Sequence, residues 1–126
     1  MCAQAIFPTL RYDDAQTAID FLERAFGLER RSITEEVGIV HHAELAYGDS
    51  VVMVGSNQTE GPLDFPPPGS GAVYVLVDDV DAHHERAVTE GAEIVMELTD
   101  QDYGSREYAA RDPEGHTWNF GTYRPK

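Results

Sequence analysis

Two side chains that could bind a ligand or move a proton lie close together in the first half of the chain. His42 and Glu44 are separated by a single residue. Because alternate residues of a β-strand point to the same face, an extended segment would place this imidazole and this carboxylate side by side. Such a pair can hydrogen-bond a ligand or act in acid–base catalysis, and a solvated strand edge is the alternative. A metal ion bound by His42 and Glu44 alone would lack a third protein ligand.

The remaining candidate groups include two more distant histidines, His84 and His116, and one cysteine. His84 shares the apolar face of a predicted helix with Val80, Ala87 and Val88, so we expect a partly buried, hydrogen-bonded side chain. His116 directly follows a turn glycine, and we expect it to lie at the surface or to anchor a loop. The single cysteine, Cys2, excludes a disulfide within the chain and favours a cytoplasmic location.

The elements that must position these residues occur twice along the chain. A strand-like run is followed by an Asp-Asp pair that can cap a helix, and a glycine ends that helix. The Asp-Asp pairs, Asp13-Asp14 and Asp78-Asp79, are 65 residues apart, and the glycines, Gly27 and Gly91, are 64 apart. Three strand segments are expected after each glycine, at 28–35, 38–47 and 50–55 and then at 92–98, 104–111 and 116–122. The repeat predicts one domain over 1–126, with modules at about 4–55 and 72–123 and a Gly- and Pro-rich linker at 56–71.

Composition narrows the classes of partner. Nine basic residues face 23 acidic ones, which gives a formal net charge of −14. This charge repels a phosphate backbone, so we expect no nucleic-acid partner, and it favours a cationic ligand. No apolar run reaches the roughly 18 residues that would span a membrane, so we expect no membrane partner.

Three stretches of the sequence resemble the vicinal oxygen chelate superfamily, the class of glyoxalases, bleomycin resistance proteins and dioxygenases. They are Val75-Leu76-Val77-Asp78-Asp79-Val80-Asp81-Ala82, Glu90-Gly91-Ala92-Glu93 and Arg111-Asp112-Pro113-Glu114-Gly115-His116. The resemblance implies an α+β fold of two tandem βαβββ modules, forming a curled, cup-like mixed sheet with the helices outside. It also implies that a metal, in members that are enzymes, is bound by the first and last strand of each module.

Those four metal positions fall on Phe7, Met53, Ala72 and Asn119 in this chain. Phe and Ala cannot ligate a metal, a Met thioether is a soft ligand, and Asn offers one neutral oxygen. We therefore expect no metal at these positions and no cofactor.

Alternation along the strands predicts which residues line the cup. Alternation places Arg11 and the predicted ligand-binding residues on the inner face of the cup. The opposite face, towards the helices, carries Trp118, Phe120, Val73, Val75 and Val77. The predicted ligand-binding residues are Phe7, Thr9, Met53, Ala72, Tyr74, Leu76 and Asn119. This lining is mostly apolar with a few polar groups, as is usual for small-molecule sites. In the segment Tyr103–Arg106, Arg106 could pair with an acidic residue or clamp an anionic ligand, and the sequence leaves both open.

The resemblance and the missing metal ligands favour one function over two others. We expect metal-independent binding or sequestration of a small, partly apolar molecule, cationic or aromatic, as in the superfamily's antibiotic-resistance members. The alternative is an enzyme, a lyase, isomerase or dioxygenase, with a displaced metal or a metal-free acid–base site at His42 and Glu44. An interaction module without a small ligand is the third possibility. A homodimer is expected because pairing covers open sheet edges.

Overall fold

The computed structural model describes residues 6–57 and 67–124, and these form two copies of one βαβββ unit. The first copy consists of β1 (Thr9–Tyr12), α1 (Ala15–Phe26), β2 (Glu29–Glu36), β3 (Ile39–Tyr47) and β4 (Ser50–Ser56). The second consists of β5 (Ala72–Leu76), α2 (Val80–Thr89), β6 (Glu93–Asp100), β7 (Arg106–Arg111) and β8 (Thr117–Gly121). The predicted α+β fold of tandem modules is confirmed.

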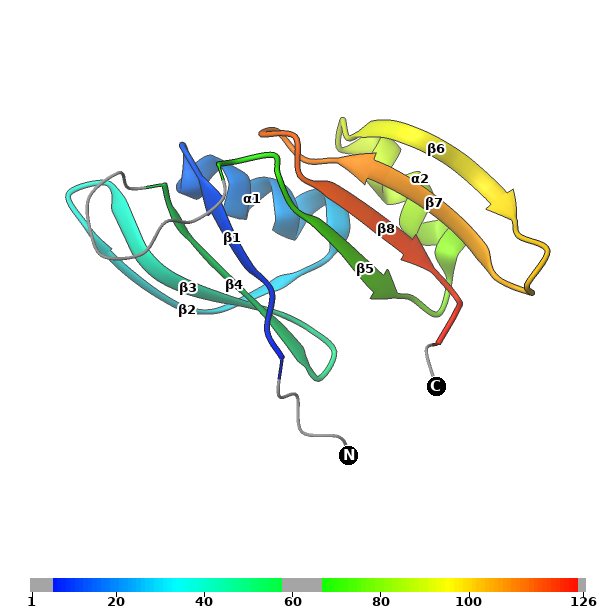
Figure 1. The fold of residues 1–126 in the computed structure, drawn as a ribbon. Coiled ribbons are helices and arrows are strands. Elements are labelled where there is room, and N and C mark those ends of the chain that lie inside the picture. Colours follow the sequence, from blue (N-terminus) through cyan, green and yellow to red (C-terminus); the bar gives the residue numbers. More distant parts are fainter. Residues whose placement is uncertain (1–5, 58–66, 125–126) are drawn as a thin grey trace.

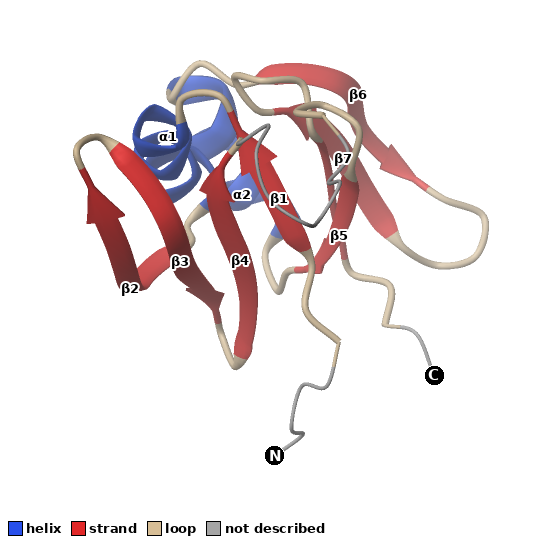
Figure 2. Ribbon diagram, turned by 60° about the vertical axis from the view of Figure 1, so that its left-hand side comes forward, coloured by secondary structure: helices blue, strands red, loops and turns tan. Residues whose placement is uncertain are grey.

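Each module carries its own four-stranded mixed sheet, and the two sheets have the same topology (Figure 1). The strand orders are β1-β4-β3-β2 and β5-β8-β7-β6. In both sheets the first strand runs parallel to the last, and the other neighbours are antiparallel. Both helices lie on the same side of the sheets (Figures 1 and 2), so the described residues leave the opposite face of each sheet without a covering helix.

The helix boundaries follow the caps predicted from the sequence. The Asp14 side chain accepts the Thr17 backbone N–H at 3.2 Å, and the Asp79 side chain accepts that of Ala82 at 3.1 Å. Gly27 ends α1 in the left-handed conformation with φ 80°, which a residue without a Cβ adopts at little cost. No helix in the described part of the chain is long and apolar enough to cross a membrane.

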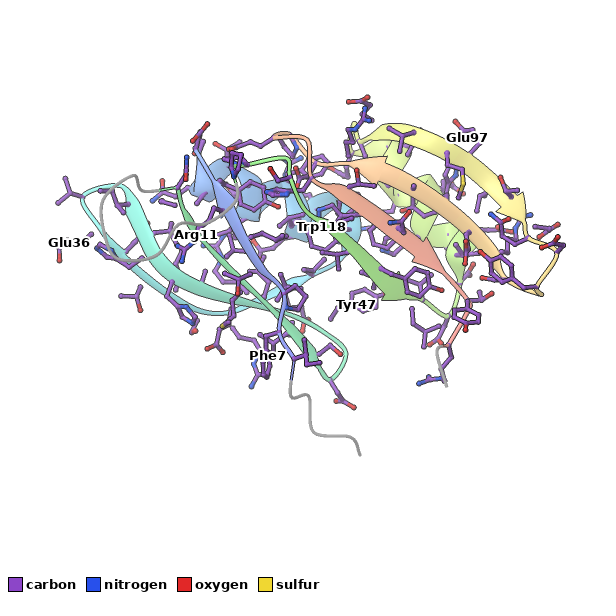
Figure 3. The ribbon with its side chains drawn as sticks, in the orientation of Figure 1. Phe7, Arg11, Glu36, Tyr47, Glu97 and Trp118 are labelled. Carbon is purple, nitrogen blue, oxygen red and sulfur yellow. The ribbon has the colours of Figure 1, made fainter. Side chains whose placement is uncertain are left out.

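The strand-like run before Asp13-Asp14 forms a short strand. β1 begins at Thr9, because Pro8 has no N–H to donate and only its carbonyl joins the ladder, accepting the Met53 N–H at 2.9 Å. Phe7 therefore precedes the sheet and is 40% exposed, at the periphery of the molecule (Figure 3). Residues 58–66 of the predicted linker lie outside the described residues, and Ser56 belongs to β4.

The core lies between the helices and one face of each sheet. The alternation predicted for this face is confirmed, since Val52, Val54, Trp118 and Phe120 are buried and Trp118 is fully so (Figure 3). Phe26 at the end of α1 packs against Trp118 and Phe120 of the second module, with ring centroids 5.6 and 4.8 Å away. The two modules thus share one apolar core.

A buried carboxylate joins the modules at one end of this core. Oδ2 of Asp112 accepts hydrogen bonds from the Tyr12 hydroxyl and, at 3.0 Å, from the Trp118 indole N–H. Its Oδ1 accepts the backbone N–H groups of Glu114 and His116, both at 3.1 Å. Burial, and then the charge of Asp112, raise the pKa of Tyr12, so this hydroxyl stays protonated and donates.

His116 anchors a loop, one of the two outcomes expected for it, and it is buried rather than at the surface. Its Nδ1 accepts the Gly71 N–H at 3.3 Å, and its Nε2 lies 3.0 Å from the Arg11 carbonyl oxygen. The ring also packs edge-on against Tyr12 at 4.7 Å. This histidine therefore connects the end of the linker with β1.

The second helix corrects one prediction about its faces. Val80 and Ala87 are buried as expected, and His84 is partly buried and hydrogen-bonded, also as expected. Val88, by contrast, is 50% exposed, and His83 is the side chain that lies between the modules. His83, three residues after Val80, lies over the ring of Phe120, whereas His84 extends to Glu97 at 3.0 Å. The apolar stripe is thus narrower than the spacing suggested, and it turns towards α1.

Candidate functional site

A hollow of about 190 Å³ opens on the uncovered face of the first sheet. It is lined by Thr9, Arg11, His41, His42, Met53 and Val54. Thr9 and Met53 face each other in the parallel register of β1 and β4, and Met53 pairs with Glu44 of β3. Three residues singled out from the sequence, Thr9, His42 and Met53, are therefore brought together.

The two side chains that the sequence placed side by side, His42 and Glu44, are in contact beside this hollow. His42 Nε2 lies 3.2 Å from Oε2 of Glu44, and both side chains are half-exposed. A carboxylate at this distance orients the imidazole by hydrogen bonding. The pair can donate to or accept from a bound ligand, and its geometry also suits proton transfer.

Arg11 and His41 complete the polar side of the hollow. The sequence placed Arg11 on the inner face but did not predict either residue as ligand-binding. The Arg11 side chain lies over Gly55, where an added Cβ would collide with Nη1, and this Nη1 is 3.5 Å from the Ser56 carbonyl oxygen. Glycine within a strand often marks a close approach of another group. Gly55 could therefore have indicated from the sequence that a side chain such as Arg11 lies close to this strand, whereas no feature of the sequence marked His41 as a lining residue.

The other predicted ligand-binding residues lie on the second sheet. Tyr74 pairs with Asn119 and Leu76 with Gly121 in the parallel register of β5 and β8, and Ala72 begins β5. Ala72 and Tyr74 are exposed, and Leu76 and Asn119 are half-buried. The hollow described above is lined by the first module alone, so the structure divides the predicted lining between two sheets. Phe7 lies outside both.

Arg106, for which the sequence left two roles open, forms ion pairs. Its Nε is 2.7 Å from Oδ1 of Asp81, and its Nη1 is 3.1 Å from Oδ1 of Asp100. Asp81 belongs to α2, so Arg106 lies on the helix side of the second sheet. Of the two roles left open for Arg106, the structure shows pairing with acidic residues.

A larger hollow, of about 250 Å³, lies between α1 and β2 and is a weaker candidate. Its lining includes Arg30, Asp20, Gln16 and Glu35. Arg30 already pairs with Asp20 at 2.9 Å, and Gln16 bonds Glu35. Since these polar groups satisfy one another, a ligand would have to displace existing interactions.

Comparison with known proteins places the chain in a family. Residues 5–120 match the model of the Glyoxalase/Bleomycin resistance protein/Dioxygenase superfamily. The uncharacterized protein Mb0911c of Mycobacterium bovis is 36% identical over 124 residues, which cover 93% of this chain and 82% of that protein. The crystal structure of TioX from Micromonospora sp. ML1 is 35% identical, covers 97% of this chain and all of that chain, and superposes with a TM-score of 0.81.

The chain therefore belongs to the glyoxalase/bleomycin resistance protein/dioxygenase superfamily, as the resemblance of its sequence implied. The fosfomycin resistance protein FosX from Mesorhizobium loti shares the fold, with a TM-score of 0.67 at 16% identity over 98% of this chain and 94% of that one.

Proposed function

We propose that this protein binds a small, partly apolar molecule without using a metal ion, with the hollow of the first module as the binding site. The observation that carries the proposal is the make-up of the hollow. Met53 supplies an apolar surface, and Thr9, Arg11 and two histidines supply polar groups. An apolar surface with a few converging polar groups is the usual composition of a small-molecule site.

The chemistry of the side chains supports a metal-independent mode. The positions at which the family's enzymes bind a metal carry Phe7, Met53, Ala72 and Asn119 here, none of them anionic. Among residues 6–57 and 67–124 no three His, Cys, Asp or Glu side chains come together in a group that could hold a metal ion. Protein–ligand contacts must then supply the affinity, and Met53 suits irregular apolar surfaces because its side chain is flexible and polarisable.

A role in sequestering a toxic molecule extends this proposal. FosX is a resistance protein by its name, but at its level of identity it supports the fold alone. The sequestering role therefore rests on the hollow and on membership of the superfamily, and a cytoplasmic location is supported by the single cysteine.

Filling the hollow tests the proposal. Three probes that share one ring, benzoate, benzylamine and benzyl alcohol, are titrated while amide and methyl NMR signals are followed. We expect at least one probe to shift the signals of Thr9, His42 and Met53. Met53→Trp should weaken the binding of that probe by about tenfold or more, because the larger side chain occupies the space of the ligand.

Ala72→Trp is the matched control, since it adds the same ring to an exposed position on the other sheet. Unchanged binding in this variant assigns the site to the first module. If both substitutions abolish binding, the site spans both sheets, as the sequence alone predicted. If no probe shifts the hollow residues, or if Met53→Trp binds as tightly as the parent, the proposal is wrong.

The contact between His42 and Glu44 supports a second candidate function, metal-free acid–base catalysis. Chemical conversion of a bound probe or substrate, detected by mass spectrometry and abolished by His42→Gln, would establish it. Binding that survives His42→Gln without any conversion favours the binding protein.

We also propose that the protein forms a homodimer. Each sheet has two edge strands, β1 and β2 in the first and β5 and β6 in the second. Pairing or covering such edges removes a site of uncontrolled association. Sedimentation velocity should give a dimer at micromolar protein, and a monomer at that concentration contradicts the proposal.

A further inference from the structure

Three tyrosines surround one carboxylate on the uncovered face of the second sheet. Tyr74, Tyr103 and Tyr123 are 36%, 57% and 45% exposed, and they place three aromatic rings together at the surface. Glu107, on β7, lies among them and is half-buried. Of this group only Tyr74 was predicted as a ligand-binding residue. The cluster is hereafter the tyrosine–Glu107 cluster.

Hydrogen bonds fix the geometry of this cluster. One oxygen of Glu107 accepts from the Tyr103 hydroxyl at 2.8 Å, and the other accepts from the hydroxyl of buried Ser105 at 2.9 Å. The Tyr74 hydroxyl donates to the Tyr123 carbonyl oxygen at 2.7 Å. The rings of Tyr103 and Tyr123 meet edge to face, with centroids 5.8 Å apart. The aromatic faces are therefore held in place before any ligand arrives.

The negative charge in the cluster has no cationic partner among the described residues. Arg106 is adjacent to Glu107 in the chain, but it is engaged on the helix side by Asp81 and Asp100. The described residues form no ion pair with Glu107, whose oxygens receive only neutral hydroxyl donors. The hydrogen bond to Glu107 raises the pKa of Tyr103, and burial followed by Glu107 raises that of Tyr74. The Tyr74 and Tyr103 hydroxyls thus stay protonated beside a carboxylate that has no cationic partner in the described part of the chain.

A glycine makes room for this arrangement. A Cβ added at Gly121 would lie 2.5 Å from Cγ of Glu107 and 3.0 Å from the Tyr74 hydroxyl. Gly55 occupies the same place in the first module, 66 residues earlier, and makes room there for Arg11. Both modules therefore have a glycine at this place. A cationic side chain lies beside it in the first module, and an anionic side chain lies beside it in the second.

We propose that the tyrosine–Glu107 cluster binds an organic cation, a protonated amine or a quaternary ammonium group. Electron-rich ring faces attract such cations, tyrosine being among the effective rings, and a carboxylate supplies the opposite charge. A hard divalent metal does not fit, because it requires several oxygen ligands and the cluster offers one carboxylate. The formal net charge of −14 adds a general attraction for cations.

The inference goes beyond the proposed function, because it adds a second site, on the second module, for an organic cation. Choline and its neutral carbon analogue 3,3-dimethyl-1-butanol have nearly the same shape and differ in charge, so they serve as probes. In NMR titrations choline should shift the ring signals of Tyr74, Tyr103 and Tyr123, and the neutral analogue should not.

Substitutions then separate the cluster from the general acidity of the surface. Glu107→Gln should weaken the binding of choline by about fivefold or more, because the negative charge beside the aromatic rings is lost. Tyr103→Ala should weaken it similarly while the amide spectrum shows a folded protein. Asp49→Asn is the matched control, because it removes one negative charge from an exposed turn of the first module and should leave choline binding within about twofold.

Every outcome bears on the inference. Equal losses in Glu107→Gln and Asp49→Asn, equal binding of choline and the neutral analogue, or no choline-dependent shift in the three tyrosines would overturn it. Met53→Trp distinguishes this failure from failure of the proposed function. Choline binding should survive Met53→Trp, whereas the binding of the hollow's own probe should not.

Discussion

Replacing Asp112 by alanine should lower the free energy of unfolding by about 3–5 kcal/mol. Its carboxylate accepts four hydrogen bonds, two of them from the buried Tyr12 hydroxyl and the Trp118 indole N–H. Alanine leaves these buried donors without an acceptor, at roughly 1–3 kcal/mol for each. Because a domain of this size is stable by about 5–15 kcal/mol, the loss is a large fraction of its stability. Urea unfolding followed by the fluorescence of Trp118, the only tryptophan, measures it.

Two further substitutions make this prediction specific. Asparagine has the shape of aspartate, but an NH2 group replaces one of the two acceptor oxygens. In one orientation of the amide, this NH2 group faces the Tyr12 and Trp118 donors. We therefore expect Asp112→Asn to lower the free energy of unfolding by an intermediate amount, about 2 kcal/mol. Asp102→Ala removes an exposed carboxylate from the turn before β7 and should change stability by less than about 0.5 kcal/mol. A value for Asp112→Ala as small as that for Asp102→Ala would show that the carboxylate does not join the modules.

The sequence predicted the elements of this fold closely because their signals are local. The cap residues Asp14 and Asp79 and the turn glycine Gly27 act within a few residues of their own position, and strand alternation identified Trp118 and Phe120 as core. In the sequence, Asp112 was visible only as part of one of the three stretches that resemble the superfamily. Its partner Tyr12 lies 100 residues away, and no local pattern relates the two.

The candidate site was predictable in part for the same reason. The contact of His42 with Glu44 followed from strand alternation. The placement of the two sheets depends on packing between modules, which alternation does not determine. The sequence therefore assigned one lining to residues such as Met53 and Tyr74, which the structure places on different sheets. Glu107 was missed because an acidic residue on a strand of so acidic a chain carries no distinct signal.

Replacing His83 by alanine should cost about 2–4 kcal/mol, since this side chain joins the two helices through the core. Nε2 of His83 donates to the Phe26 carbonyl oxygen at the end of α1, 2.8 Å away, and Nδ1 accepts from the Tyr108 hydroxyl at 2.6 Å. The ring also packs on Phe120 at 4.3 Å. Alanine removes both polar partners and leaves a space among aromatic rings, and each effect costs roughly 1–3 kcal/mol.

The same residue should make stability decrease in mild acid. Burial, chiefly, and the charge of Arg86 lower the pKa of His83 below its ordinary 6.5, although the bond to Phe26 opposes this. The unfolded chain therefore binds a proton at His83 at a higher pH than the folded protein does. As the pH falls below about 6.5, proton binding favours the unfolded state and this stability is lost, while above about pH 7.5 His83 contributes no pH dependence.

Thermal unfolding from pH 8 to 5 measures this effect. The melting temperature of the parent should approach that of His83→Gln as the pH falls, because glutamine does not titrate. His84→Gln, which removes the neighbouring partly exposed imidazole, is the control and should keep the acid-dependent loss of the parent. Melting curves of the parent and His83→Gln that stay parallel across this range would show that His83 does not titrate differently in the folded and unfolded states.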